Sequence, residues 1–373
     1  MSNTPIPIAR PQLGVEEEEA ALRVLRSGWI MQGPEVAAFE RELSTFVDAP
    51  YACAVSSGTA ALHLALIAVG VGPGDEVVAP SHSFIATANA VRLCGATPVF
   101  VDIQQGTYNL DARLLMDAIT SQTRAVLVVH QLGMPAELGE IVAHCEMRGV
   151  ALVEDAACAL GSEIKLGEHW ERIGRPRGAA ACFSFHPRKL VTTGDGGMIT
   201  TRDAAIDERV RRLRQHGADP RGTFLEPAFN YRMTDLQAAV GRVQLGRLPG
   251  LLTERRAQVE RYRAALVPLG LEVPVEPVDR LSNWQSLCVR LPTALDPAAI
   301  VDALAAEQIG VRRGVSNAHE QPAYEAKGCY RAAGALLLSE RAWRHGLCLP
   351  MYPGMTDDEI ARVVAALRPH VTL

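Results

Sequence analysis

From about residue 50 onward, short apolar runs alternate with segments whose apolar residues have helical spacing. Six runs are apolar almost throughout instead of alternating with polar positions: residues 76–80, 97–103, 125–130, 150–154, 180–185 and 198–201. Strands of this kind are typically buried on both faces. The pattern therefore predicts an α/β fold in which helices cover a mostly parallel central sheet.

The residues around position 250 predict a change of domain. Thr234-Asp235-Leu236-Gln237 has the residues of a capping box and predicts a helix as far as about Leu248. Pro249-Gly250 should interrupt this helix, and a second helix is expected over residues 251–266. We place the domain boundary at the interruption. Residues 1–249 would form an N-terminal arm and a large domain, and residues 250–373 a small α/β domain with strands near 287–291 and 310–312 and helices near 297–307 and 357–367.

The composition narrows the class of protein. The 373 residues are 48% hydrophobic and 21% charged, which is ordinary for a soluble globular enzyme. A net charge of -5 gives no reason to expect nucleic acid or an anionic membrane as a partner. The eight cysteines include no Cys-x-x-Cys pair and no Cys/His cluster with metal-ligand spacing, so we expect reduced core cysteines and no metal site. The N-terminus lacks the features of a signal peptide and no apolar run is long enough to span a bilayer, so a cytoplasmic protein is expected.

Three polar motifs carry candidate chemistry. Lys189 follows the run 180–185 and precedes Thr192-Thr193-Gly194-Asp195-Gly196-Gly197; Asp155 follows the run 150–154; Ser57-Gly58-Thr59-Ala60 precedes a helical segment. A lysine amine can form a Schiff base with an aldehyde, and a carboxylate can hold a pyridine nitrogen protonated. N–H groups at the start of a helix can bind a phosphate. In this order the three motifs predict a site for pyridoxal 5'-phosphate (PLP), and hence an enzyme.

Each motif also has a plainer interpretation. Ser57 could be only a helix cap, and Asp155 only a cap or a turn residue. An isolated lysine is most often a solvated surface residue. Lys189 differs from that case because it lies between a buried apolar strand and a glycine-rich turn, where the backbone can approach a ligand closely.

Three further motifs complete a family pattern: Pro80-Ser81-His82-Ser83-Phe84-Ile85-Ala86-Thr87, Thr107-Tyr108-Asn109-Leu110-Asp111 and Asn230-Tyr231-Arg232-Met233-Thr234-Asp235. The motifs in this order resemble the DegT/StrS-type sugar aminotransferases of the DegT/DnrJ family, which are fold type I PLP enzymes. The resemblance covers nearly the whole chain, from about Gly28 to Pro353. It implies a PLP-dependent aminotransferase that moves an amino group from an amino acid, by analogy glutamate, to a keto sugar. We expect this sugar to be a nucleotide-linked 3- or 4-keto sugar.

The resemblance also implies a role for individual residues. Lys189 would carry PLP and move the proton, and Asp155 would face the pyridine nitrogen. Asn230 would reach the phosphate in the partner subunit, which implies a homodimer with shared active sites, although locally it could equally be a turn residue. Phe84 would stack on the cofactor ring, with core packing as its alternative. The remaining cofactor contacts would go to the phosphate, from Gly58, Thr59, Ala60 and Ser184.

Cys158 departs from the family pattern, which more often has Gln or His at this position beside the phenolic oxygen of PLP. A thiol is a weak hydrogen-bond donor, so this contact could be absent or made through water, and Cys158 could equally pack in the core. Leu190 replaces an Asn that often follows the lysine, and Asp195 replaces a more usual Glu; neither change touches the core chemistry.

A nucleotide-linked sugar carries a diphosphate and an amino donor carries carboxylates, so fixed cations are expected near the site. The candidate substrate contacts are His186, Arg232, Arg312, Arg313 and His319, and solvated surface is the plain interpretation of the arginines and His319. For His186 the alternative is a satisfied histidine of the fold.

Four other functions are weighed against this hypothesis. An aminocyclitol aminotransferase would use the same residues. A PLP-dependent sugar dehydratase of this family typically has histidine in place of the lysine, which Lys189 argues against. A dinucleotide-dependent oxidoreductase could be proposed from Gly70-Val71-Gly72-Pro73-Gly74, but this stretch follows a helix and precedes a strand, the wrong order for a dinucleotide fingerprint. A non-catalytic PLP-binding regulator remains open.

Overall fold

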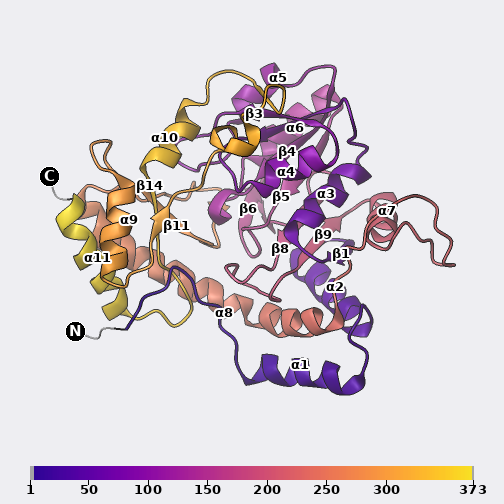
Figure 1. Ribbon diagram of the computed structural model, residues 1–373, viewed down its shortest axis with the longest axis horizontal. Coiled ribbons are helices and arrows are strands. Elements are labelled where there is room, and N and C mark those ends of the chain that lie inside the picture. Colours follow the sequence, from indigo (N-terminus) through magenta and orange to yellow (C-terminus); the bar gives the residue numbers. More distant parts are fainter. Residues whose placement is uncertain (1–3, 372–373) are drawn as a thin grey trace.

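The computed structural model describes residues 4–371, and an eight-stranded sheet lies at its centre (Figure 1). The strand order across the sheet is β1-β9-β8-β5-β4-β2-β3-β13. Five neighbouring pairs in this order are parallel, from β8 through to β13, while β9 is antiparallel to both β1 and β8. The strands are β1 (Tyr51–Val55), β2 (Glu76–Pro80), β3 (Thr97–Val101), β4 (Thr123–Val129), β5 (Ala151–Asp155), β8 (Ala180–Ser184), β9 (Gly197–Thr201) and β13 (Arg331–Ala332).

Helices cover both faces of this sheet. Successive strand residues point to opposite faces, and because both sets are apolar, both faces must be buried. In β5, Leu152 packs in one apolar core, whereas Val153 packs in a second core on the other face. The first core includes residues of α2 (Pro34–Val47), α5 (Leu115–Ala118), α6 (Leu138–Arg148) and α8 (Asp235–Leu266). The second includes residues of α3 (Gly58–Ala68), α4 (Ala86–Leu93) and α7 (Ala204–Arg214). The apolar runs in the sequence follow from this burial on both faces, and the predicted α/β fold with a mostly parallel sheet is confirmed.

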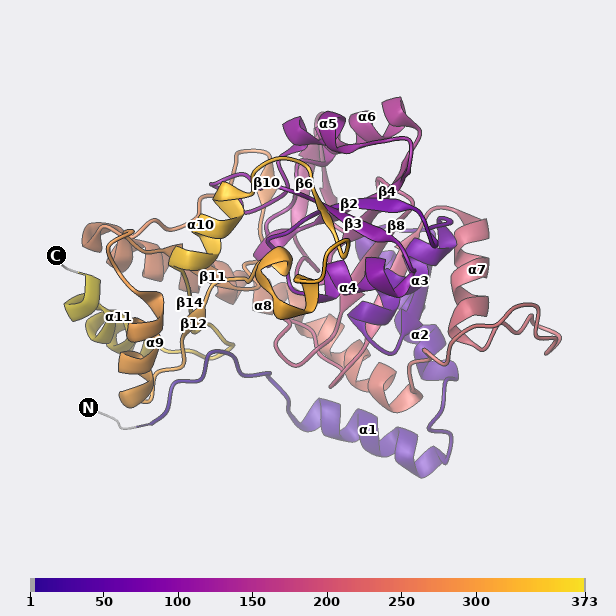
Figure 2. The same cartoon turned by 45° about the horizontal axis from the view of Figure 1, so that its top comes forward.

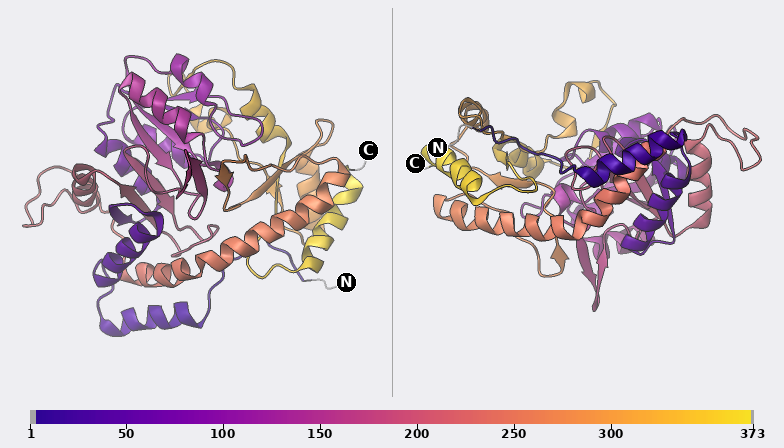
Figure 3. Two further views of the ribbon diagram at one scale, coloured as in Figure 1. Left: turned by 180° about the vertical axis from the view of Figure 1, so that it is seen from behind. Right: turned by 90° about the horizontal axis from the view of Figure 1, so that it is seen from below.

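A single helix of 32 residues, α8, connects the two parts of the protein (Figure 3). The predicted interruption at Pro249-Gly250 is wrong, because α8 continues through Pro249. A proline inside a helix removes one backbone hydrogen bond and is unfavourable by roughly 3 kcal/mol. Both halves of α8 are held by apolar packing, the first half in the large core at Leu248 and the second in another core at Val259 and Tyr262. This packing overrides the local preference to break.

The small domain is built around a three-stranded antiparallel sheet, in the order β11-β14-β12. Its strands are β11 (Leu287–Arg290), β12 (Arg312–Arg313) and β14 (Gly346–Leu349), and its helices are α9 (Pro297–Ala306), α10 (Leu337–His345) and α11 (Asp357–Val371). Ile6 from the N-terminal arm packs in the same core and pairs with Ile309, so this part of the arm lies on the small domain. The domain boundary at 249/250 falls inside α8 and stays a prediction.

Two elements lie outside the main layers. Helix α1 (Val15–Ser27) lies along α8 (Figure 2). Glu17 of α1 accepts a hydrogen bond from Gln244 and pairs with Arg247, both on α8. A small antiparallel sheet, β10-β6-β7, is formed by β6 (Glu163–Leu166), β7 (His169–Arg172) and β10 (Arg280–Leu281). Within residues 4–371, no helix combines the length and the apolar character that a bilayer-spanning segment requires.

Candidate active site

The candidate site lies where two parallel neighbouring strands end. Strands β5 and β8 pair in parallel with Asp155 opposite Cys182, so the last residues of both strands reach the same edge of the sheet. Asp155 is the last residue of β5, and Ser184 is the last residue of β8. The carboxyl edge of a parallel sheet is where α/β folds place ligand-binding groups. The predicted position of Asp155 at a strand end is therefore observed, and Ser184 ends the neighbouring strand.

Asp155 is a buried carboxylate with two hydrogen-bond donors. Its side chain is close to fully buried, and Oδ2 accepts from the Thr87 hydroxyl at 2.8 Å while Oδ1 accepts from the Ala157 N–H at 3.1 Å. Burial raises the pKa of Asp155, and the hydrogen bond from Thr87 and the nearby positive charge of Lys189 act in the opposite direction. Because a buried carboxylate is stabilised by an adjacent cation, this position fits a protonated pyridine nitrogen.

Lys189 reaches back toward Asp155 from the loop after β8. Its backbone N–H donates to the His186 carbonyl at 2.8 Å, which closes a turn, and its Nζ lies 3.0 Å from the sulfur of Cys158. The chain has three lysines in total. Lys165 pairs with Glu168 on the β6–β7 hairpin, and Lys327 is exposed in a loop. Lys189 is therefore the lysine that the fold brings to the carboxyl edge of the sheet beside Asp155.

The start of α3 packs tightly against the end of β8. Ser57 caps the helix by accepting a hydrogen bond from the Ala60 N–H at 3.1 Å, so the capping interpretation of Ser57 is correct. A Cβ atom at Gly58 would lie 2.7 Å from the Cβ of Ser184, and one at Gly197 would lie 2.4 Å from the Ser57 carbonyl oxygen. Glycines are thus required for the first turn of α3 to approach Ser184. This places a helix N-terminus and a hydroxyl group side by side, an arrangement suited to a phosphate.

Phe84 and Asn230 are exposed in the single chain. The Phe84 side chain is 71% exposed, so it does not pack in the core and is free to contact a ligand. Asn230 is exposed and pairs with Gln215 in an isolated bridge. Its neighbour Tyr231 accepts a hydrogen bond from the Ser56 N–H at 2.8 Å, so Asn230 lies close along the chain to the turn that precedes α3.

The two adjacent arginines of β12 face in different directions, as neighbouring residues of a strand do. Arg312 lines a small pocket of about 20 Å³ together with Arg188 and Gln285, so it faces the loop that carries Lys189. The guanidinium of Arg313 instead lies 4.0 Å from the ring centroid of Trp343, in a cation–π contact. The two arginines are equivalent in the sequence, whereas in the structure only Arg312 shares a pocket with Arg188, in the loop that carries Lys189.

The remaining predicted substrate residues are spread over several loops. His319 Nδ1 lies 2.6 Å from the Ser81 hydroxyl, next to the segment that ends in Phe84. His186 is exposed three residues before Lys189, and its Nδ1 accepts from the Arg188 N–H at 3.2 Å. Arg232 is partly exposed, between Tyr231 and the start of α8. The structure therefore connects His186 and His319 to neighbours of the site by direct contacts, and it gives no such contact for Arg232.

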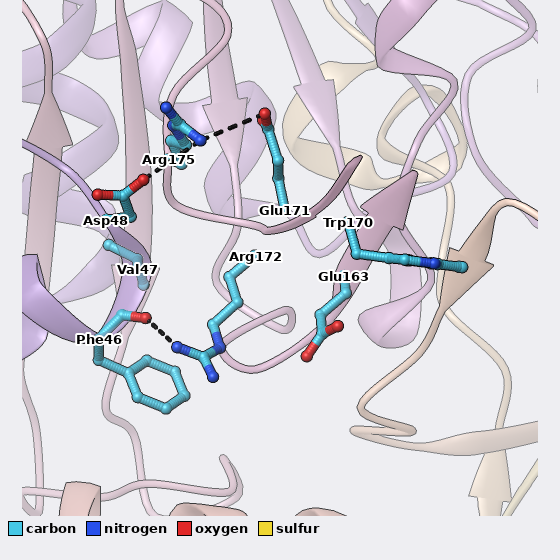
Figure 4. Close-up of a pocket in the computed structure, with 8 residues that line it drawn as sticks. All are labelled: Phe46, Val47, Asp48, Glu163, Trp170, Glu171, Arg172 and Arg175. Atoms are coloured by element: carbon cyan, nitrogen blue, oxygen red, sulfur yellow. Dashed lines mark hydrogen bonds and ion pairs between the residues drawn. The ribbon is translucent and has the colours of Figure 1, made fainter. Parts of the chain in front are cut away.

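A separate surface pocket of about 190 Å³ lies between the end of α2 and the β6–β7 hairpin (Figure 4). Arg175 lies 3.2 Å from Asp48 and 3.3 Å from Glu171, and Arg172 donates to the Phe46 carbonyl at 2.6 Å. None of the predicted site residues lines this pocket, so it lies outside the candidate site. In the described part of the chain, no group of three or more His, Cys, Asp or Glu side chains is arranged to hold a metal ion.

Three residues at the site were not singled out by sequence reasoning. Thr87 belongs to the motif at residues 80–87, and its hydroxyl donates to Asp155. Asn283 and Gln285 come from a loop about 100 residues after Lys189 and contact the loops of Cys158 and Lys189. The sequence feature that could have pointed to Asn283 and Gln285 is the mostly polar segment Ser282-Asn283-Trp284-Gln285-Ser286, directly before the apolar strand β11.

Comparison with known proteins agrees with this geometry. The sequence profile described as the DegT/DnrJ/EryC1/StrS aminotransferase family matches residues 11–368. DesV from S. venezuelae, solved in complex with a ketimine intermediate, is 34% identical, with a TM-score of 0.91 and 98% of each chain covered. DesI, solved in the presence of its TDP-sugar product, is 32% identical, with a TM-score of 0.90 over 99% of this chain and 93% of that one. Spr1654 from Streptococcus pneumoniae, solved in a PLP form, is 27% identical, with a TM-score of 0.91 and 99% of each chain covered.

The match covers almost all of the chain at 34% identity to DesV, and the predicted family resemblance is confirmed. Buried Asp155, Lys189 and the tight approach of α3 to Ser184 have the chemistry that a PLP ring nitrogen, aldehyde and phosphate require. The chain belongs to the DegT/DnrJ/EryC1/StrS aminotransferase family and is a PLP-dependent sugar aminotransferase.

Proposed function

We propose that Lys189 binds the PLP aldehyde and that Asp155 holds the ring nitrogen protonated. The observation that carries this assignment is that Lys189 and Asp155 lie at one edge of the sheet, where the charge of Lys189 acts on the buried carboxylate. Gly58, Thr59 and Ala60 at the start of α3, with Ser184, would hold the phosphate. Phe84 would cover one face of the ring, and Cys158 would lie beside the phenolic oxygen.

The bound cofactor supplies an electron sink for the carbon from which a proton is removed. In this proposal the protein positions the reacting groups and moves the proton. Lys189 Nζ, which lies 3.0 Å from the Cys158 sulfur, would take the proton from the donor amino acid and return it. Asp155 would face the ring nitrogen as a carboxylate, and the hydrogen bonds from Thr87 and Ala157 hold its two oxygens in place.

For the substrates, we propose a nucleotide-linked 3- or 4-keto sugar as acceptor and glutamate as donor. DesI, named with a TDP-sugar product, supports the nucleotide-linked class. Arg312 is the best-placed cation for an anionic group of a substrate, since it faces the Lys189 loop with Arg188. His186 and His319 would be further polar contacts, and Arg232 and Arg313 are the weaker candidates because the structure does not direct them to this loop.

We also propose a homodimer whose active sites are shared, with Asn230 acting on the partner's phosphate site. Large apolar side chains are exposed near the turns that would meet a partner, including Phe84 at the site itself. Others follow α1 or lie in the loop before Asn230, namely Trp29, Ile30, Met31, Phe224 and Leu225. Contact with a partner subunit would bury these exposed apolar groups, which supports an interface on this side of the protein.

The assignment of Lys189 is tested by reducing the holoenzyme with borohydride and mapping the labelled peptides by mass spectrometry. Only three lysines can be labelled, so the outcome is unambiguous. The expected label is on Lys189, with Lys165 and Lys327 unmodified. A label on either of those two lysines would reject the assignment, and so would a Lys189→Ala variant with the transamination rate of the wild type.

A further inference from the structure

Gln285 holds the backbone on both sides of Lys189. This residue lies two positions before β11, in the loop that leads into the small domain, and its side chain is buried. Its Oε1 accepts from the Leu190 N–H at 3.1 Å, and its Nε2 donates to the Arg188 carbonyl at 2.5 Å. One carboxamide therefore bonds to both peptide groups that flank the Lys189 Cα atom.

These contacts matter because a lysine side chain is long and flexible, and the backbone fixes only its first bond. Lys189 lies in a loop between Phe185 and Thr193, where its own N–H is bonded to the His186 carbonyl. With Gln285, the peptide groups before and after Lys189 both have fixed orientations. The direction of the Cα–Cβ bond is then fixed as well, and so is the region that Nζ can reach. Small displacements of a reacting group can lower rates strongly.

Asn283 connects Gln285 to the loop of Cys158. The Asn283 Oδ1 accepts from the Gln285 N–H at 2.9 Å, and its Nδ2 donates to the carbonyls of Cys158 and Leu160, both at 2.9 Å. The Asn283 carboxamide fits against Gly133, where a Cβ atom would lie 2.0 Å from its Oδ1. The same short segment thus holds the backbone of both residues of the Lys189–Cys158 contact.

We propose that Gln285 is a positioning residue for Lys189, which it aims at the carboxyl edge of the sheet by fixing both flanking peptide groups. The proposal rests on the proposed function, in which Lys189 binds PLP. Gln285 touches the backbone of the lysine loop and acts through it. A purely structural role would lower stability without changing the properties of the lysine, and that difference defines the test.

The test compares Gln285→Met with Gln258→Met. Methionine keeps the length of glutamine and removes both hydrogen-bonding groups. Gln258 is the matched control because it is also buried, and its Nε2 donates to the Tyr352 carbonyl at 2.8 Å, away from the lysine loop. Should Gln285→Met fail to fold, Gln285→Ala admits water to the two backbone groups and serves in its place.

The first readout uses the cofactor-free protein. Trace acetylation with acetic anhydride, followed by mass spectrometry, measures the labelling of Lys189 relative to Lys165 and Lys327 in the same molecule. Gln285→Met should raise this ratio at least threefold, since a less constrained Lys189 spends more time in solvent, and Gln258→Met should leave it at the wild-type value. The second readout is the donor half-reaction of the holoenzyme, where Gln285→Met should lower kcat about tenfold with a change in KM below threefold.

An unchanged labelling ratio in a folded Gln285 variant would overturn the positioning role, as would an equal loss of kcat in Gln258→Met. Failure of the proposed function has a different signature: borohydride would then label a lysine other than Lys189 in the wild-type holoenzyme. The two failures are therefore distinguishable, because the acetylation ratio is measured without cofactor and the borohydride label is measured with it.

Discussion

The amine of Lys189 lies 3.0 Å from the sulfur of Cys158, across the edge of the sheet where β5 and β8 end. The sequence left Cys158 between core packing and a place near the cofactor. Cys158 is only partly buried, and six of the other seven cysteines are buried. Its position beside Lys189 favours the second interpretation.

Bound PLP should protect Cys158 from alkylation. Cys158 and Cys329 are the two partly exposed cysteines, so iodoacetamide should modify both in the cofactor-free protein. Loading with PLP should slow the alkylation of Cys158 at least tenfold and leave Cys329 unaffected as the internal control. Peptide mass mapping over time measures both rates. Equal rates for Cys158 with and without PLP would place it outside the cofactor site.

Asp155→Asn should retain cofactor but lower the transamination rate by at least tenfold, about 1.4 kcal/mol in activation free energy. A neutral amide cannot hold the ring nitrogen protonated. Single-turnover measurements with the amino donor would show the loss directly. A reduction smaller than tenfold would mean that Asp155 does not act on the ring.

The same substitution should not destabilise the cofactor-free protein at pH 7. Burial raises the pKa of Asp155 above its unfolded value, so the favourable contribution of the protonated form is present below about pH 4 and is lost as the pH rises through the folded pKa. Above the folded pKa the charged side chain therefore costs stability, which Asn removes. The Tm of cofactor-free Asp155→Asn at pH 7 should equal or exceed that of the wild type. A clearly lower Tm would indicate that hydrogen bonding to the carboxylate outweighs its desolvation.

Mixing two inactive variants tests the shared active site. In a heterodimer of Lys189→Ala and Asn230→Ala subunits, one site would contain both wild-type residues if Asn230 acts on the partner's cofactor. Activity of purified heterodimers should then recover to about half that of the wild-type dimer, provided that Asn230→Ala alone is strongly impaired. Heterodimers that stay inactive would show that Asn230 acts within its own subunit or not at all.

Arg312→Ala and Arg313→Ala should have different effects. Arg312 faces the Lys189 loop, so its loss should raise the KM for the sugar nucleotide. The increase should correspond to a loss of roughly 1–3 kcal/mol in binding free energy, while the donor half-reaction changes little. Arg313 packs on Trp343, and its loss should lower Tm with the KM nearly unchanged. Steady-state kinetics and thermal unfolding of both variants decide this. If Arg312→Ala impairs glutamate and spares the sugar nucleotide, Arg312 binds the donor carboxylate instead.

Acid should destabilise the protein through His82. Burial lowers the pKa of His82 to about 4, so its contribution to stability is full above about pH 6.5 and is lost as the pH falls toward 4. Replacing it with Gln should flatten the dependence of Tm on pH in this window. His169→Gln, on the exposed face of β7, is the control and should keep the wild-type slope. If His82→Gln keeps the wild-type dependence of Tm on pH, other groups cause the acid sensitivity.

The sequence by itself determined the class of fold and pointed to Lys189 and Asp155 as the candidate chemical groups. Strands buried on both faces must be apolar throughout, so the runs around β4 and β5 identified the parallel sheet. Lys189 and Asp155 stood out because polar groups directly after such strands reach the carboxyl edge of the sheet. The start of α8 was also readable, since Thr234 and Gln237 form the predicted capping box.

The tertiary structure decided what depends on contacts between distant segments. Pro249 should end a helix by local preference, yet α8 continues because its two halves are buried in two different cores. Arg312 and Arg313 are equivalent in the sequence, and only the pairing of β12 sets which one faces the loop that carries Lys189. Gln285 holds the Lys189 loop from 96 positions away, because hydrogen bonds form between groups that folding brings together, whatever their separation along the chain.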